Sequence, residues 1–131
     1  MTDWEKLIEA AIKAQCNAYA PYSKFKVGAA LLADNNEIFT GCNVENSSYG
    51  LTNCAERTAV FKAVSEGQTD FKAIVVYSNS EPAAKPCGAC RQVLYEFNPD
   101  MKIICVNDKD EKTEFVLSKL LPEGFRLINK G

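Results

Sequence analysis

The sequence predicts an α/β fold in which helices cover both faces of a mixed sheet of five strands. Stretches with apolar residues at helical spacing alternate with short apolar runs that are typical of strands. Their order is helix, two strands, helix, strand, helix and two strands, which favours a mixed sheet. At 131 residues the chain is long enough for one core and too short for two ordinary domains. We therefore expect residues 1–131 to form a single domain.

The N-terminal quarter predicts a helix followed by a hairpin. Thr2 or Asp3 is a suitable cap for a helix that runs to about Ala18, because apolar side chains then recur at helical spacing. The extended runs Val27–Ala33 and Glu37–Cys42 flank a turn-rich Asp-Asn-Asn sequence, which is typical of a hairpin.

A polar loop over residues 43–53 precedes the second predicted helix, Cys54–Glu66. Thr52 or Asn53 is the expected cap of this helix, and Gly67 is expected to end it.

The second half predicts a buried strand, a third helix, two more strands and a short helix. The strand Lys72–Tyr77 is followed by a helix over Pro86–Phe97, because proline is favoured at or near a helix start. Lys102–Val106 and Lys112–Val116 are the last two expected strands, and Ser118 is a suitable cap for a short helix.

Three cysteines and a glutamate carry the clearest chemical signal. Cys87 and Cys90 lie three residues apart at a predicted helix start, so both sulfurs can face one metal ion. Cys54 would complete a set of three thiolate ligands from the other helix. A catalytic zinc site keeps three protein ligands and leaves the fourth position for water, and Glu56 could exchange protons with that water. The sequence therefore predicts one catalytic Zn²⁺ per chain.

The three thiolates and the zinc ion together carry one excess negative charge, which weakens zinc as a Lewis acid. Arg57 follows Glu56 directly and is the expected source of compensating charge, through a hydrogen bond to a ligand sulfur. The other cysteines, Cys16, Cys42 and Cys105, stand among apolar residues and are expected to behave as small hydrophobic side chains.

Charge and composition indicate the setting of the protein. The net charge of −2, without a basic strip, gives no reason to expect nucleic acid as a partner. The N-terminus lacks the features of a signal peptide, and no apolar run approaches the length of a membrane span. A cytoplasmic location is expected.

Four segments of the chain form a recognisable set: Ser-Lys-Phe-Lys-Val-Gly at residues 23–28, Gly-Cys-Asn-Val-Glu-Asn at 41–46, Cys-Ala-Glu-Arg at 54–57 and Pro-Cys-Gly-Ala-Cys-Arg-Gln at 86–92. Together they resemble segments of the small cytidine deaminases of nucleoside salvage, and they occur in the order found in that family. The resemblance implies a three-layer α/β/α fold and hydrolytic removal of the exocyclic amine of cytidine or deoxycytidine. Glu56 would protonate ring nitrogen 3 and then the departing amine.

The resemblance also assigns the substrate contacts and the assembly. Asn43 and Glu45 match the ribose-binding pair, Phe25 matches the aromatic residue that packs on the pyrimidine, and Ala55 matches a further substrate contact. Tyr49 and Phe125 resemble residues that reach the site of a neighbouring subunit, although the tail after Phe125 departs from the usual pattern. The short members of the family are homotetramers, so a homotetramer with shared active sites is implied.

Three alternatives stay open at this point. A related deaminase of another aminopyrimidine, such as a blasticidin S deaminase, would share the metal motif, although residues 43–46 favour a nucleoside. A non-catalytic zinc module would need a fourth ligand, which Glu56 could supply. A redox dithiol at Cys87 and Cys90 would leave Cys54 and Glu56 unexplained.

Overall fold

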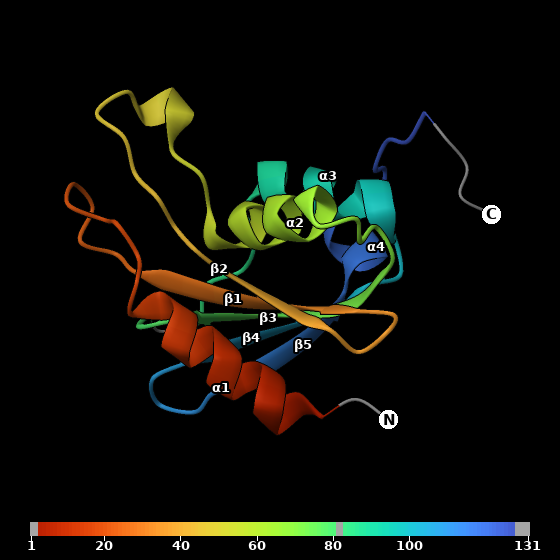
Figure 1. Ribbon diagram of the computed structural model, residues 1–131, viewed down its shortest axis with the longest axis horizontal. Coiled ribbons are helices and arrows are strands. Elements are labelled where there is room, and N and C mark those ends of the chain that lie inside the picture. Colours follow the sequence, from red (N-terminus) through yellow and green to blue (C-terminus); the bar gives the residue numbers. More distant parts are fainter. Residues whose placement is uncertain (1–2, 81–82, 128–131) are drawn as a thin grey trace.

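The computed structural model describes residues 3–80 and 83–127, and it places a five-stranded sheet between helices on its two faces (Figure 1). The strand order is β2-β1-β3-β4-β5. The elements along the chain are α1 (Trp4–Gln15), β1 (Val27–Ala33), β2 (Ile38–Cys42), η1 (Tyr49–Leu51), α2 (Ala55–Ser65), β3 (Phe71–Ser78), α3 (Gly88–Phe97), β4 (Lys102–Asn107), β5 (Lys112–Val116) and α4 (Leu117–Leu120).

The sheet is mixed, as predicted. Strand β1 pairs antiparallel with both β2 and β3, and β5 pairs antiparallel with β4. The pair β3 and β4 is parallel, and α3 makes the connection between these two strands. A parallel pair needs such a crossover, because its second strand must begin at the same edge as the first.

Side-chain alternation in the central strands builds a core on each face. Leu31 in β1 and Ile74 in β3 point to the face covered by α2 and α3, where they join Ala59 and Val60. Their neighbours in the strands point to the opposite face, where the buried side of α1 covers them. Successive side chains of a strand alternate between faces, so buried central strands need apolar residues at nearly every position.

A glycine allows α2 to lie against the sheet at its N-terminal end. A Cβ atom on Gly41 would lie 2.5 Å from both the Ala55 carbonyl oxygen and the Ala59 nitrogen. Because these are backbone atoms, no side-chain movement could relieve the overlap. Gly41 in β2 therefore sets how closely the first turn of α2 approaches the sheet.

Several predicted helix boundaries were wrong by one to three residues. Helix α1 ends at Gln15 rather than Ala18, and Asp3 caps it, while Thr2 lies outside the described residues. Cys54 itself is the N-cap of α2, in place of Thr52 or Asn53. At the other end of α2, Gly67 adopts a φ of +92°, which explains why the helix stops there.

The later boundaries differ in the same way. Helix α3 begins at Gly88 with Cys87 as its N-cap, so Pro86 precedes the helix. Val116 rather than Ser118 occupies the cap of α4. The predicted loop 43–53 contains a short 3-10 helix, η1, which was not predicted.

The three cysteines outside the metal motif differ in burial. Cys105 is fully buried in β4, as an apolar surrounding predicts, and Cys42 is half-buried. Cys16 is exposed at the end of α1, so its predicted place among apolar side chains was wrong. Among the described residues, no helix has both the length and the apolar character that crossing a membrane requires.

Candidate active site

Two helix N-termini bring the three motif cysteines together. Cys54 caps α2, Cys87 caps α3, and Cys90 lies in the first turn of α3. Within the described chain, these cysteines are the one group of potential metal ligands whose donor atoms all lie within 4.8 Å of one another. The partial positive charge of each helix N-terminus stabilises thiolates at this position.

The sulfur positions fit a zinc ion. The Sγ atoms of Cys54 and Cys87 are 3.6 Å apart, and those of Cys87 and Cys90 are 3.3 Å apart. A tetrahedral zinc ion with Zn–S bonds of about 2.3 Å requires sulfurs about 3.8 Å apart. Both of these separations are within about 0.5 Å of that value. Glu56 is not part of the cysteine cluster.

The three thiols share charge through hydrogen bonds. The pKa of Cys54 is lowered to about 5, chiefly because the Cys90 thiol donates to it and also because Arg57 donates to it. The pKa of Cys90 is raised strongly, because its proton is shared with Cys54 and because it is buried. A divalent cation would replace such shared protons, since thiolates are the form that binds metal.

Arg57 contacts the cluster as its place in the sequence suggested. Its Nη2 donates to Cys54 Sγ at 3.5 Å and to the Thr52 carbonyl oxygen at 3.4 Å. The contact with the sulfur raises the pKa of Arg57. A guanidinium that donates to a ligand sulfur withdraws charge from it.

Glu56 is a buried carboxylate beside the cysteines. Its exposed fraction is 4%, and burial raises its pKa to about 7, with the neighbouring Cys54 charge adding to the effect. A carboxylic acid with a pKa near neutrality can both accept and return a proton, as a general acid–base catalyst must.

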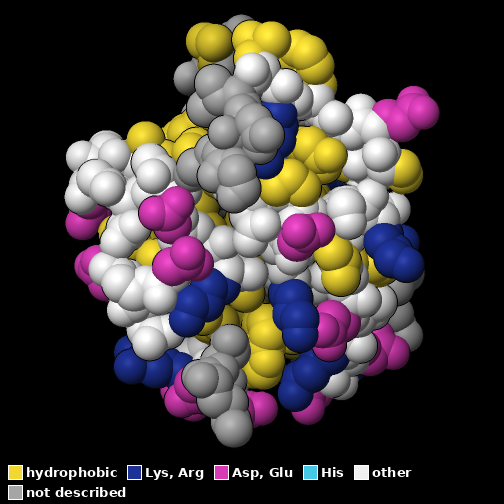
Figure 2. Space-filling view, turned by 90° about the vertical axis from the view of Figure 1, so that its right-hand side faces the viewer, with side chains coloured by type: hydrophobic (Ala, Val, Ile, Leu, Met, Phe, Trp, Pro, Cys, Tyr) yellow, Lys and Arg dark blue, Asp and Glu magenta, His cyan; other side chains and the backbone are white. Residues whose placement is uncertain are grey.

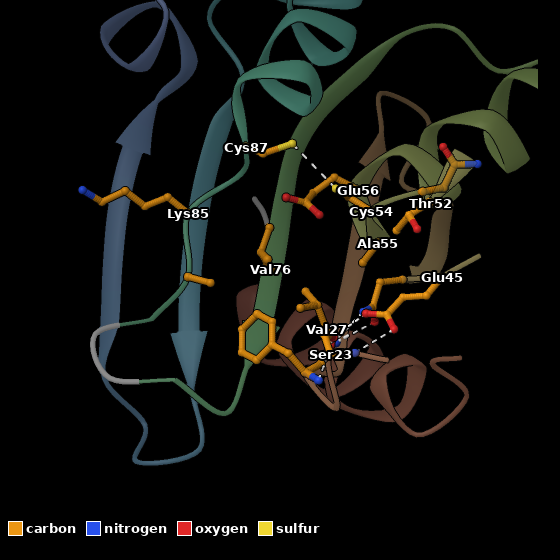
Figure 3. Close-up of a pocket in the computed structure, with 14 residues that line it drawn as sticks. Ser23, Val27, Glu45, Thr52, Cys54, Ala55, Glu56, Val76, Lys85 and Cys87 are labelled. Carbon is orange, nitrogen blue, oxygen red and sulfur yellow. Dashed lines mark hydrogen bonds between the residues drawn. The ribbon is translucent and has the colours of Figure 1, made fainter. Parts of the chain in front are cut away.

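A pocket of about 230 Å³ connects the cysteines with the predicted substrate contacts. The ends of β1, β2 and β3 meet here with the start of α2 and the segment before α3. In Figure 3, Cys54, Cys87 and Glu56 lie toward one end of the pocket, whereas Ser23 and Glu45 lie toward the other. The lining includes seven of the predicted site residues: Phe25, Asn43, Glu45, Cys54, Ala55, Glu56 and Cys87.

Asn43 holds the segment that carries Phe25. Its side-chain oxygen accepts from the Val27 N–H at 2.9 Å, and its side-chain nitrogen donates to the Phe25 carbonyl oxygen at 2.7 Å. Asn43 is buried, whereas Phe25 is 38% exposed at the pocket. An amide nitrogen carries two hydrogens, so Asn43 retains one donor for a ligand.

Glu45 is held in place by the loop before β1. Its carboxylate accepts from the backbone N–H groups of Tyr22 and Ser23, at 3.0 and 3.1 Å, and from the Ser23 hydroxyl. These hydrogen bonds, that of the Ser23 side chain first, lower the pKa of Glu45. Glu45 therefore remains an ionised acceptor, with its position fixed before any ligand arrives.

Two of the predicted substrate contacts lie outside this pocket. Tyr49 is 77% exposed and borders a second hollow that also includes Tyr22 and Glu45. Phe125 is 62% exposed, and its backbone is bound to Gln92 of α3. Neither side chain contributes to the pocket of its own chain.

The comparisons with known proteins assign the family. The family model described as "Cytidine and deoxycytidylate deaminase zinc-binding region" matches residues 1–107. The chain belongs to this deaminase family. Its Cys54, Cys87 and Cys90 form the zinc-binding triad of the family region.

Individual relatives are similar over nearly the whole chain. The cytidine deaminase of Sporosarcina psychrophila is 55% identical over 124 residues, which cover 94% of this chain and 91% of the relative. That of Halalkalibacterium halodurans is 51% identical, with 94% of each chain covered. The crystal structure of cytidine deaminase from Burkholderia pseudomallei superposes with a TM-score of 0.91 at 48% identity, covering 95% of this chain and all of that one. The predicted α/β fold and the zinc-dependent deaminase assignment are thereby confirmed.

Some residues around the deaminase pocket were not singled out from the sequence. Ser23 begins the segment 23–28, but its hydrogen bond to Glu45 joins positions 22 residues apart, and no local pattern indicates it. Lys85 lines the pocket, yet its side chain points away from it (Figure 3), with Nζ 5.2 Å from the centre of the Phe115 ring.

Proposed function

We propose that this chain catalyses the hydrolytic deamination of cytidine and deoxycytidine to uridine and deoxyuridine, with release of ammonia. The observation that carries the proposal is one pocket lined by Glu56 and by Cys54 and Cys87, two members of the three-cysteine zinc site. The curated relatives named cytidine deaminase, which match nearly the full length, support the substrate class.

The reaction adds water to carbon 4 of the pyrimidine and breaks the bond to the exocyclic nitrogen. Cys54, Cys87 and Cys90 would hold a zinc ion, which would supply Lewis acidity to activate the attacking water. Glu56 takes a proton from the attacking water and gives it to ring nitrogen 3. It then moves the remaining hydroxyl proton to the amine, so that ammonia leaves and the carbonyl forms. The Glu56 pKa of about 7 allows this carboxyl group both to accept and to donate a proton near neutral pH.

The rest of the pocket orients the nucleoside. We assign Phe25 to the pyrimidine face, because its half-exposed ring borders the pocket. Glu45 accepts a hydrogen bond from a ribose hydroxyl, and the spare donor of Asn43 completes the sugar contact. The N–H group of Ala55 is among the first four of α2, which have no partner inside the helix, and so it can bind the base. Arg57 moderates the charge of the thiolates.

The assembly we propose is a homotetramer that shares its active sites between subunits. Helix α2 buries Ala59 and Val60 on the sheet, yet it also exposes Phe61 by 49% and Val64 by 37%. Figure 2 shows hydrophobic side chains gathered in the upper part of that view, the side of α2, α3 and α4 in Figure 1, with charges of both signs interspersed below. An exposed apolar surface of this kind favours contact with a second copy. Tyr49 and Phe125 are then available to neighbouring pockets.

The six free cysteines support a reducing, cytoplasmic setting, because zinc-binding thiols must stay unoxidised.

The deciding experiment measures zinc per chain in the purified protein and the change in ultraviolet absorbance when cytidine is added. Deoxycytidine, cytosine and blasticidin S are tested in parallel. We expect about one zinc per chain and the fastest turnover with the two nucleosides. Faster turnover of blasticidin S would favour the related deaminase, and zinc without any turnover would favour a non-catalytic metal. Absence of zinc would reopen the dithiol interpretation.

A further inference from the structure

The guanidinium of Arg91 joins two segments that lie far apart in the sequence. Its Nε donates to the Pro86 carbonyl oxygen at 2.8 Å, and its Nη1 donates to the Leu120 carbonyl oxygen at 3.0 Å. Pro86 directly precedes the zinc ligand Cys87, while Leu120 is the last residue of α4. One planar side chain thus spans from the zinc motif to the C-terminal part of the chain.

Both carbonyl groups need a donor from elsewhere. Pro86 is buried and precedes the N-cap, so its carbonyl lies outside the hydrogen bonds of α3. The carbonyl of Leu120 is among those at a helix end that have no partner inside the helix. The rigid fork of a guanidinium can fix the separation of two acceptors, whereas a lysine ammonium is a flexible point charge.

Helix α3 bears further contacts with the C-terminal part. The Gln92 side chain donates to the Phe125 carbonyl oxygen at 2.7 Å and accepts from the Phe125 N–H at 3.4 Å. A Cβ on Gly124 would lie 2.5 Å from the Tyr95 ring, so this glycine lets the chain cross close over the helix. Leu117 anchors α4, because its side chain is fully buried and its N–H donates to the Met101 carbonyl oxygen at 2.9 Å.

We propose that Arg91 is a positioning residue for the zinc site, which fixes the Pro86–Cys87 backbone against the anchored end of α4. It binds no metal and touches no substrate. Its hydrogen bonds hold the Cys87 sulfur at the separation from Cys54 and Cys90 that zinc requires. The affinity for zinc therefore depends on the C-terminal helix, although that helix contributes no ligand. The inference rests on the cysteine site and not on the substrate proposed above.

The positive charge of Arg91 could by itself affect the affinity for zinc, and substitutions distinguish this effect from positioning. Arg91→Lys keeps the charge but cannot hold both carbonyl groups in a fixed geometry, whereas Arg91→Ala removes both charge and hydrogen bonds. Glu96→Ala, on the same helix and outside the site, is the matched control. Zinc affinity is measured by competition with a chromophoric chelator, without nucleoside, so that the result does not depend on which substrate is deaminated.

We expect Arg91→Ala to weaken zinc binding by roughly 10- to 100-fold, the range typical of groups that orient metal ligands. Arg91→Lys should recover only a minor part of this loss, and kcat should return close to that of the unmodified protein when zinc is saturating. Glu96→Ala should bind zinc normally. Normal affinity in Arg91→Ala, or full recovery in Arg91→Lys, would overturn the positioning role.

A second perturbation tests the link to α4 without touching α3. Leu121→Pro removes the hydrogen bond from the Leu121 N–H to the Leu117 carbonyl oxygen, which is 3.0 Å long, and disfavours helical backbone at Leu120. We expect weaker zinc binding in this variant and little further loss when it is combined with Arg91→Ala. If the losses of zinc affinity in the two single variants multiply in the double variant, Arg91 does not act through α4.

Discussion

Glu56 shows at the scale of one residue how burial creates a catalytic group. An exposed glutamate is ionised at neutral pH and returns a proton poorly, because its pKa is far below the working pH. In this chain the first turn of α2 places Glu56 at 4% exposure beside a cluster of thiols, and its pKa rises to about 7. The sequence position two residues after Cys54 therefore determines both the place of the carboxyl group and its proton affinity.

Replacing Glu56 by Gln should separate metal binding from catalysis. The side chain keeps its size, and the three thiolates remain, so zinc content should stay near one per chain. Turnover of cytidine should fall by about 10²- to 10⁴-fold or more, because the amide cannot carry protons. Zinc analysis and a spectrophotometric rate assay on the same preparation check this. A variant with most of its rate intact would remove Glu56 from the mechanism.

Ser23 should control the pH dependence of nucleoside binding. Its hydroxyl lowers the pKa of Glu45, so the Glu45 carboxylate stays ionised when the pH falls below the ordinary glutamate range. In Ser23→Ala that pKa moves back up, and protonation of Glu45 begins at higher pH. The KM for cytidine should then start to rise at a higher pH than in the unmodified protein.

The measurement is KM against pH from neutral to acid, for cytidine and for cytosine. Ser23→Thr, which keeps a hydroxyl group, is the matched control and should retain the original profile. Cytosine lacks the sugar, so its profile should be the same in all three proteins. An identical cytidine profile in Ser23→Ala would show that Glu45 does not bind the sugar in its ionised form.

At the scale of elements, the approach of α2 to the sheet places Cys54 and Glu56. Gly41→Ala should push the first turn of this helix outward, since the new methyl group would meet backbone atoms of Ala55 and Ala59. Overpacking of this kind typically costs about 1–3 kcal/mol. We expect a lower Tm and weaker zinc binding together. Gly50→Ala is the control, because a Cβ at Gly50 meets nothing within 4 Å.

Calorimetry and chelator competition on both glycine variants distinguish a local from a general effect. If Gly41→Ala lowers the Tm but binds zinc as tightly as Gly50→Ala, the close approach of α2 to the sheet contributes to stability but not to zinc binding.

Local signals in the sequence were enough for the order of the α-helices and strands and for the metal ligands. The spacing of Cys87 and Cys90 at a helix start placed both sulfurs at one metal site, because this geometry depends on a single turn. The N-caps of α2 and α3 were predicted less well, because Cys54 and Cys87 occupy them and cysteine is not among the residues that usually cap a helix. Ser23 and Arg91 were missed as supporting residues for another reason. Their partners, Glu45 and Leu120, come close only when the whole sheet is assembled.

At the scale of the whole molecule, the two faces of the sheet differ in what they leave exposed. Helix α1 covers one face and turns mostly polar residues outward, with Ile12 at 39% exposure. On the other face, α2 exposes Phe61 and Val64, and the C-terminal part exposes Phe125. A helix that is apolar on its outer side as well as its inner side is one expected to be covered. The α2 side is therefore where the proposed tetramer should form.

Phe61→Lys should dissociate that assembly, because it places a charge where apolar side chains of two copies would meet. The unmodified protein should sediment at about four times the chain mass of 14.4 kDa, and the variant at a lower multiple. Ile12→Lys makes the same chemical change on the α1 face and should leave the mass unchanged. The KM for cytidine should rise in Phe61→Lys, since Tyr49 and Phe125 would lose the neighbouring pockets that they are proposed to complete. Dissociation with an unchanged KM would show that each pocket is complete within one chain, whereas an unchanged mass would place the interface elsewhere.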